Sequence, residues 1–182
     1  FRDVRATPIT EGAPPLWLLA SSAGSAGIAA HLGLPLVWAH FIARGPGQET
    51  VDAYRANYQP SPEYPHPIVM LATGAICAET QQEAAYVASS VQRWRASGPT
   101  RPIPEPAPPG TPLPGSDNPL FVNQRVNKPL LHGTPTYVKD ELESLADSFG
   151  ADEVLLITIT HNHAARVRSY ELLADVFDLA NS

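Results

Sequence analysis

The chain has 182 residues, a length typical of a single domain, and it is 43% hydrophobic and 16% charged, as expected of a globular protein. Its net charge is -6 and its Lys and Arg residues are scattered, which argues against nucleic acid as a partner. The single cysteine, Cys77, excludes an internal disulfide framework and a cysteine-based zinc site. With no apolar run long enough for a membrane span, these features predict a cytoplasmic protein without a membrane partner.

The N-terminal residues lack the layout of a signal peptide, and the chain begins at Phe1 rather than at a methionine. We therefore expect a processed chain or a piece of a longer one. Apolar runs predict buried strands over 15–20, 34–41, 66–78 and 152–160. Helical patterns and end signals predict helices over 22–32, 48–58, 80–96, 135–149 and 162–180.

Strands and helices alternate along the chain, which predicts an α/β fold with a parallel sheet covered by helices. In the helix over 22–32, we expect Ile28, Ala29 and Leu32 to share one face. The last helix is expected to be amphipathic, with a stripe at helical spacing. That stripe consists of Val167, Tyr170, Leu173 and Phe177.

Residues 99–119 interrupt this alternation and contain nine of the twenty prolines. Proline lacks the backbone donor that helices and sheets need, so this stretch is predicted to be an extended insertion loop within a single domain over 1–182. Two roles remain open for it. It is either a surface linker or a loop over the mouth of an active site.

The stretch "ASSAGSAG" over 20–27 places Ser21 and Ser22 where the first strand ends, with Ser25 one helical turn further on. Free N–H groups at a helix N-terminus favour a bound phosphate, and serine hydroxyls add donors. The small residues around them leave room for close approach. From spacing alone, an anion site and a simple helix cap with packing glycines remain equally open.

Ligands of such sheets bind beyond the carboxyl ends of the strands, which also selects His40, Thr73 and the segment 158–162 as candidate positions. His161 and His163 are two residues apart, so they do not share a helical face and no metal site is expected there. Arg166 and Arg168 are candidates for ion pairs or for an anion contact. Cys77 is expected to be buried and inert.

Several segments together resemble the bacterial luciferase-like family of flavin-dependent monooxygenases. The matching segments are "PPLWLLASSAGSAGIAAHLGLPLVWAHF" (14–41), "AYRANYQPS" (53–61), "AICAETQQEA" (75–84), "HGTPTYVKDEL" (132–142) and "ADEVLLITITHNHAARVRSYELLA" (151–174). The resemblance implies a (β/α)8 barrel of which this chain is the carboxyl-terminal half, from about strand 5 to strand 8.

The resemblance also implies a cofactor, flavin mononucleotide (FMN), with its phosphate at Ser21, Ser22 and Ser25. The family pattern has an acidic residue where this chain has Ser21. Beside the flavin ring the resemblance places the strand ends, namely Leu19, Ala20, Ala39 and His40. The implied reaction uses reduced flavin and O2 to oxidise a small organic substrate, with a flavin reductase as a possible partner.

Two other hypotheses remain open. The first is a non-catalytic half-barrel that binds flavin phosphate, forms a homo-oligomer, or pairs with a chain supplying the missing half, because open sheet edges invite pairing. The second is another phosphate-binding α/β protein, such as a sugar-phosphate enzyme. The catalytic residues are not identifiable from the sequence.

Overall fold

A computed structural model describes residues 7, 12, 14–43, 45–97, 102–114 and 130–179. The strands are β1 (Leu18–Ala20), β2 (Leu36–Ala39), β3 (Val69–Cys77), β4 (Leu131–Gly133) and β5 (Glu153–Ile157). The helices are α1 (Ala23–Leu32), α2 (Gly47–Ala56), α3 (Gln81–Ser97), α5 (Pro135–Phe149) and α6 (His163–Val176). Within these residues, no helix has the length and hydropathy needed to cross a bilayer.

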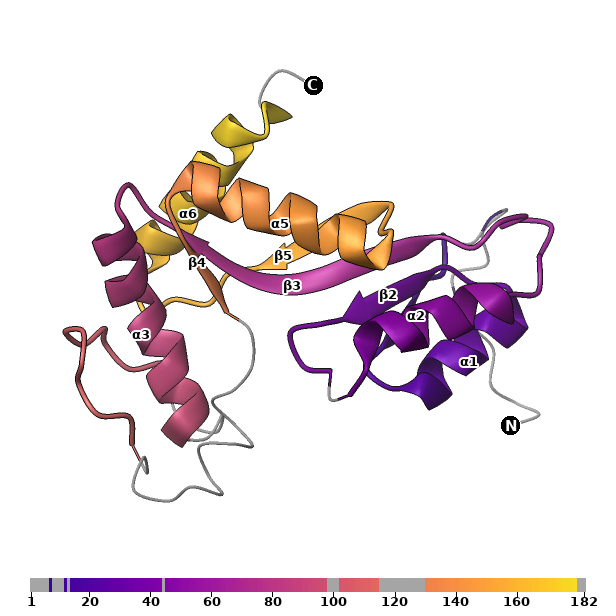
Figure 1. Ribbon diagram of the computed structural model, residues 1–182, viewed down its shortest axis with the longest axis horizontal. Coiled ribbons are helices and arrows are strands. Elements are labelled where there is room, and N and C mark those ends of the chain that lie inside the picture. Colours follow the sequence, from indigo (N-terminus) through magenta and orange to yellow (C-terminus); the bar gives the residue numbers. More distant parts are fainter. Residues whose placement is uncertain are drawn as a thin grey trace.

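All strand pairs are parallel, and the long strand β3 is the centre of the sheet (Figure 1). It pairs with β2, which in turn pairs with β1, and it pairs with β5 through residues 70–74. Helices α1 and α2 lie beside β1 and β2, α5 runs along β3 and β5, and α3 lies at the far end of β3. The predicted α/β class with a parallel sheet and covering helices is confirmed.

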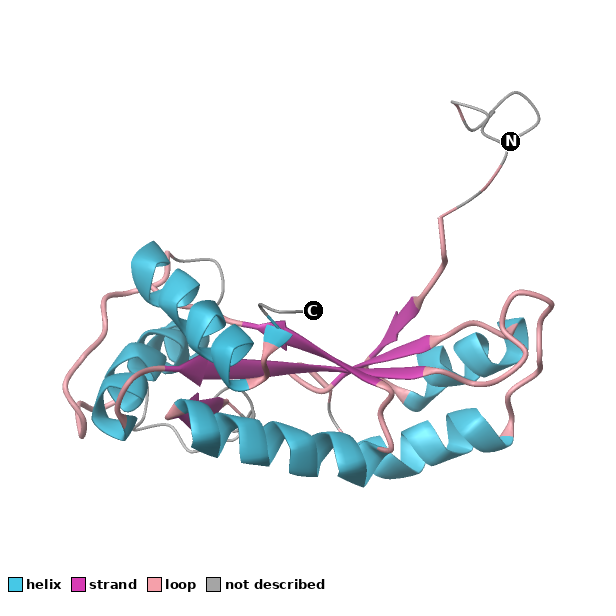
Figure 2. Ribbon diagram, turned by 90° about the horizontal axis from the view of Figure 1, so that it is seen from above, coloured by secondary structure: helices cyan, strands magenta, loops and turns pink. Residues whose placement is uncertain are grey.

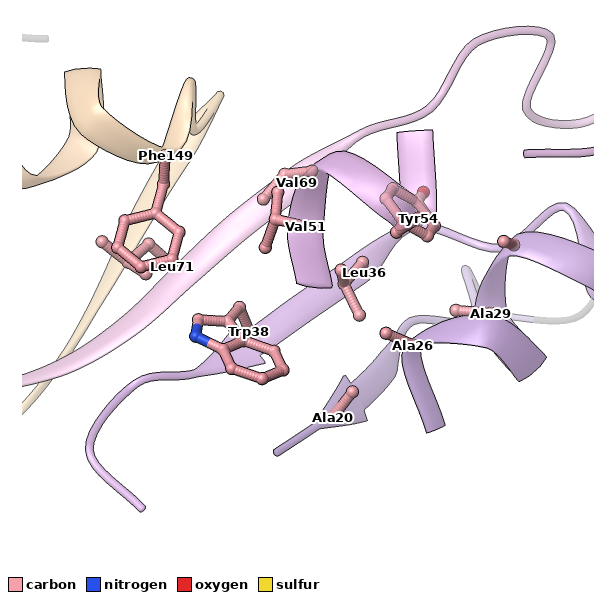
Figure 3. Packing of buried hydrophobic residues seen from close by; sticks show 11 residues of the cluster. Ala20, Ala26, Ala29, Leu36, Trp38, Val51, Tyr54, Val69, Leu71 and Phe149 are labelled. Carbon is pink, nitrogen blue, oxygen red and sulfur yellow. The ribbon is translucent and has the colours of Figure 1, made fainter. Parts of the chain in front are cut away.

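The largest core cluster lies between the β1–β2–β3 sheet and the helices α1, α2 and α5 (Figure 3). Trp38 of β2 is its largest side chain and is 2% exposed. Around it lie Ala26 and Ala29 from α1, Tyr54 from α2 and Phe149 from α5. Small residues on α1 therefore let this helix approach the sheet closely enough to enclose the indole.

Three predicted helices have boundaries within one residue of the prediction, whereas α2 and α6 end earlier than predicted, at Ala56 and Val176. The Thr80 hydroxyl accepts a hydrogen bond from the Glu83 N–H at 3.2 Å and so caps the start of α3. Gly33 and Gly150 end α1 and α5 with φ values of 62° and 54°. This left-handed conformation is the one that favours glycine after a helix.

Predictions about which faces are buried were less successful. The strand over 152–160 was expected to be buried, but β5 is mostly exposed, because it pairs only with β3 among the described strands. Ile28 and Leu32 of α1 are exposed, and alanines bury the helix instead. In α6, Leu173 is buried as predicted, whereas Val167 and Tyr170 are exposed and Leu172 and Ser169 take their places.

The short strand β4 was not predicted. It pairs with Ala75–Cys77 of β3, next to the part of β3 that pairs with β2. The described part of the proline-rich stretch, residues 102–114, contains no helix or strand, whereas 98–101 and 115–129 lie outside the described residues. It is anchored to α3, since the Ala107 N–H donates to the Ser89 hydroxyl at 2.8 Å.

Candidate functional site

The three predicted serines lie together where β1 gives way to α1. Ser22 is the N-cap of α1, and its hydroxyl accepts from the Ser25 N–H at 3.4 Å. The Ser22 and Ser25 hydroxyls lie 3.0 Å apart, and the Ser25 hydroxyl also donates to the Ser22 carbonyl at 3.2 Å. Ser22 is exposed and Ser21 and Ser25 are half-buried, so all three remain open to a ligand.

The surroundings of these serines have the space that a phosphate needs. A Cβ added at Gly27 would meet nothing within 4 Å, and one at Gly24 would meet only the Ser22 hydroxyl at 4.0 Å. The first turn of α1 contains no acidic side chain to repel an anion. Ser22 therefore caps α1, and the Ser22 and Ser25 hydroxyls lie beside open space with no acidic side chain in the first turn.

The predicted ring-contact residues lie on two different faces of the sheet. Ala20 and Trp38 are cross-strand partners in the helix-facing core, so the Ala20 side chain points away from the other face. Leu19 pairs with Val37 on the opposite face, and the alternation of β2 puts Ala39 on that face too. The structure thus brings together the backbones of these strand ends but separates their side chains.

His40 follows β2 and turns toward the helical layer. Its Nδ1 lies 3.0 Å from the buried Thr73 hydroxyl, and its ring meets Phe149 of α5 edge-on at a centroid distance of 5.8 Å. With Thr73 it lines a pocket of about 280 Å3. The other lining residues are Leu130, Leu131, Glu141 and Leu145. His40 therefore belongs to a pocket between the sheet and α5 and not to the face that carries Ala39.

Burial lowers the pKa of His40 from its usual 6.5, so the folded chain holds this ring neutral. The unfolded chain binds the proton first as the pH falls, and we expect the free energy of unfolding to fall below about pH 6.5. Urea denaturation of the wild type and of His40→Asn at several pH values between 5 and 8 measures this. The stability of the variant should depend less steeply on pH than that of the wild type, and parallel profiles would contradict the assignment.

The remaining candidates have structural roles. Cys77 is buried, and burial raises its pKa to about 11, which leaves the thiol protonated and inert as expected. Arg168 pairs with Glu79 and Glu171, its Nε lying 3.0 Å from Glu79 Oε1. His161 Nδ1 donates to the Ile103 carbonyl at 2.8 Å and thereby contacts the proline-rich segment. The described residues contain no cluster of His, Cys, Asp and Glu suited to a metal ion.

Two residues whose hydrogen bonds join distant parts of the fold were not predicted from the sequence. Asp152 accepts from the Val69 N–H through its carboxylate at 2.8 Å, and its own N–H donates to the Val69 carbonyl at 2.8 Å. Arg55 of α2 donates to the Phe149 carbonyl at 2.8 Å and so ties α2 to the end of α5. Neither has a local sequence signal, because each partner is far away in the chain.

Comparison with known proteins identifies the family. Residues 1–153 match the family model described as luciferase-like monooxygenase. The chain is 31% identical over 182 residues to the uncharacterized protein YceB of Bacillus subtilis (strain 168), covering 97% of this chain and 54% of the relative. It is 30% identical over 165 residues to a luciferase-like monooxygenase of Escherichia coli (strain K12), covering 89% of this chain and 49% of the relative.

A solved structure agrees with these sequence matches. The crystal structure of apo-MsnO8 superposes with a TM-score of 0.76 at 34% identity, covering 97% of this chain and 55% of that one. The chain thus spans about half the length of the relatives that it matches. A match to the family model over most of its residues places this chain in the luciferase-like monooxygenase family.

Proposed function

We propose that this chain is part of a flavin-dependent monooxygenase that takes FMN as its flavin and oxidises a small organic substrate with O2. The observation that carries the proposal is the exposed Ser22–Ser25 hydroxyl pair at the N-terminus of α1, within a segment that matches the family. A relative of 30% identity is named a luciferase-like monooxygenase, which supports the reaction class. When bound, the flavin would supply the redox chemistry, and the protein would bind and orient it.

In this proposal, Ser22 and Ser25 donate hydrogen bonds to the FMN phosphate, together with the free N–H groups of the first turn of α1. Ser21 is a further donor. The ends of β1 and β2, at Ala20 and Ala39, lie next to the ring. His40, which faces α5 in the structure, would act from its pocket by positioning the end of β2.

Replacing Ser25 with alanine tests the phosphate role, because Ser25 is not the residue that caps α1. We expect the affinity for FMN to fall by about 1.5–3 kcal/mol, since a hydrogen bond to a charged phosphate is lost. Binding of riboflavin, which has no phosphate, should stay nearly unchanged. Flavin fluorescence titration measures both ligands.

A second test variant is Ser22→Gly, which removes the other hydroxyl of the pair. Glycine is tolerated at helix N-termini, so α1 should keep its start. The variant should also weaken FMN binding selectively. Equal losses for FMN and riboflavin in either variant would show that the serines only hold the helix. Tighter binding of a sugar phosphate than of FMN would instead favour a sugar-phosphate enzyme.

We also propose that a second half-barrel completes the site, supplied by a further stretch of polypeptide or by a second copy of this chain. Among the described strands, β1 pairs only with β2 and β5 only with β3, so each leaves one edge open. On the face away from the helices, Leu19 is 56% exposed and Leu155 is 42% exposed. Figure 2 shows the strands spreading into a twisted sheet that does not close on itself.

Light scattering of the purified chain, with absorbance in the flavin region, tests this proposal. If a second copy of the chain completes the site, the purified chain should be a dimer. If another polypeptide supplies the missing half, the isolated chain should become more ordered when that polypeptide is added. The specific alternative is a non-catalytic half-barrel, favoured by the same open edges. A chain that still takes up no FMN when the other half is supplied would contradict an enzymatic role for this chain.

A further inference from the structure

A second pocket lies between α3 and the proline-rich segment, away from the His40 pocket and from Ser21, Ser22 and Ser25. It has a volume of about 160 Å3. One wall is the face of α3 that carries Ala85, Ser89, Gln92 and Arg93, at the spacing that places residues on one side of a helix. The opposite wall is the segment 107–113, and His132 of β4 completes the lining.

The wall formed by the proline-rich segment has a fixed shape. The Thr111 N–H donates to the Pro108 carbonyl at 3.1 Å, and Gly110 has a φ of 82°, which is the pattern of a type II turn with Pro109 and Gly110 at its centre. The Thr111 hydroxyl donates to the same carbonyl at 2.7 Å. The segment is held on α3 by the hydrogen bond from Ala107 to Ser89. The pocket is therefore built by defined contacts rather than by chance proximity.

Most polar groups of the lining are already used by the protein. The Ser89 hydroxyl accepts from Ala107 and donates to the Tyr86 carbonyl at 2.6 Å. His132 donates from Nδ1 to the Leu130 carbonyl at 3.0 Å. These bonds satisfy the hydroxyls and one imidazole nitrogen, so they do not select a ligand.

Two adjacent side chains of α3 are the exceptions. The Arg93 Nε atom is buried and has no hydrogen-bond partner. The Gln92 side chain, beside it, makes no hydrogen bond with any of the described residues. A buried N–H without an acceptor is costly. The terminal nitrogens of the same guanidinium make no hydrogen bond or ion pair with the described residues, so they remain donors for a carboxylate.

We propose that this pocket binds a small organic carboxylate, with the Arg93 guanidinium as its anion partner and the Gln92 amide as a second donor. The rest of the lining favours a carboxylate with a short apolar tail over a bare inorganic anion. Ala85, Pro108, Pro109 and Leu113 present apolar surface, and prolines offer no N–H donor. The site is independent of the flavin proposal, because Ser21, Ser22 and Ser25 do not line it.

Two-dimensional NMR of the ¹⁵N-labelled chain tests the site, because it observes the Arg93 Nε–Hε group directly. Sodium butyrate is titrated at constant ionic strength, with sodium phosphate as the second arm. We expect a saturable shift of the Arg93 Nε–Hε signal with butyrate and a weaker response to phosphate. Arg93→Lys keeps the positive charge but removes the planar guanidinium, and its affinity for butyrate should fall about tenfold or more.

Arg166→Lys is the matched control, since Arg166 is exposed on α6 and the variant makes the same replacement away from the pocket. It should bind butyrate like the wild type. Equal losses in both variants would show that the anion does not select Arg93 over an exposed arginine elsewhere, and would overturn the site. Phosphate binding as tight as butyrate binding would overturn the ligand class, and no saturable shift with either anion would overturn the pocket as a binding site.

Discussion

Replacing Trp38 with alanine is expected to lower the free energy of unfolding by about 3–5 kcal/mol, the range typical of large aromatic side chains deleted from a core. The indole is 2% exposed and lies between α1, α2 and the sheet. A Cβ at Gly47 would lie 2.8 Å from the Trp38 Nε1, so the start of α2 packs directly against the indole. Urea denaturation followed by far-UV circular dichroism measures the loss.

The control is Trp38→Phe, which keeps an aromatic ring in the same space. The Trp38 Nε1 is buried without a hydrogen-bond partner, so phenylalanine removes an unpaired donor and leaves a smaller cavity than alanine does. We expect it to cost clearly less than the alanine variant. If the two variants lost the same stability, the indole nitrogen would have to contribute a bond that the folded structure does not show.

Much of the fold followed from local chemistry. Thr80 before α3, Gly33 after α1 and Gly150 after α5 mark helix ends because each satisfies backbone groups of its own helix. Apolar runs located four of the strands for the same reason, since a strand in a parallel sheet has little polar surface. The three-residue strand β4 carries no such run and forms only because β3 extends beyond β2.

Burial was harder to predict because it depends on what else is present. The apolar residues of β5 look buried in the sequence, yet Leu155 is 42% exposed since no described strand lies beyond β5. The same holds for Leu19 at the opposite edge of the sheet. This chain spans 54% of the length of YceB. We expect the additional residues of such a longer relative to cover these exposed side chains.

The candidate site was predictable only in part. The serines are neighbours in sequence, so their grouping at the start of α1 needed no tertiary information. The environment of His40 was different, because its contacts with Thr73 and Phe149 join positions 33 and more than 100 residues away. The Arg93 pocket was not predicted at all, since it exists only where the proline-rich segment returns to α3.

The end of α1 opposite the serines offers the second large effect. Replacing Gly33 with alanine is expected to destabilise the chain by about 2–5 kcal/mol, from left-handed backbone strain and from a steric clash. Gly33 has a φ of 62°, and its new Cβ would collide with the Gln59 carbonyl. That carbonyl has little freedom to retreat, because the Gln59 N–H donates to Ala30 at 2.9 Å and the Ser61 hydroxyl donates to the Gly33 carbonyl at 3.0 Å.

Gly150→Ala separates the two contributions. Gly150 has nearly the same backbone conformation, with a φ of 54°, but the atoms nearest to its Cβ would belong to the Arg55 side chain, at 3.2 Å and beyond. The end of a side chain shifts more easily than a backbone carbonyl, so this variant should cost about 1–2 kcal/mol. Equilibrium urea denaturation of both variants gives the difference between them. Equal costs would mean that the loop at Gln59 moves aside, and that the end of α1 is not fixed by this contact.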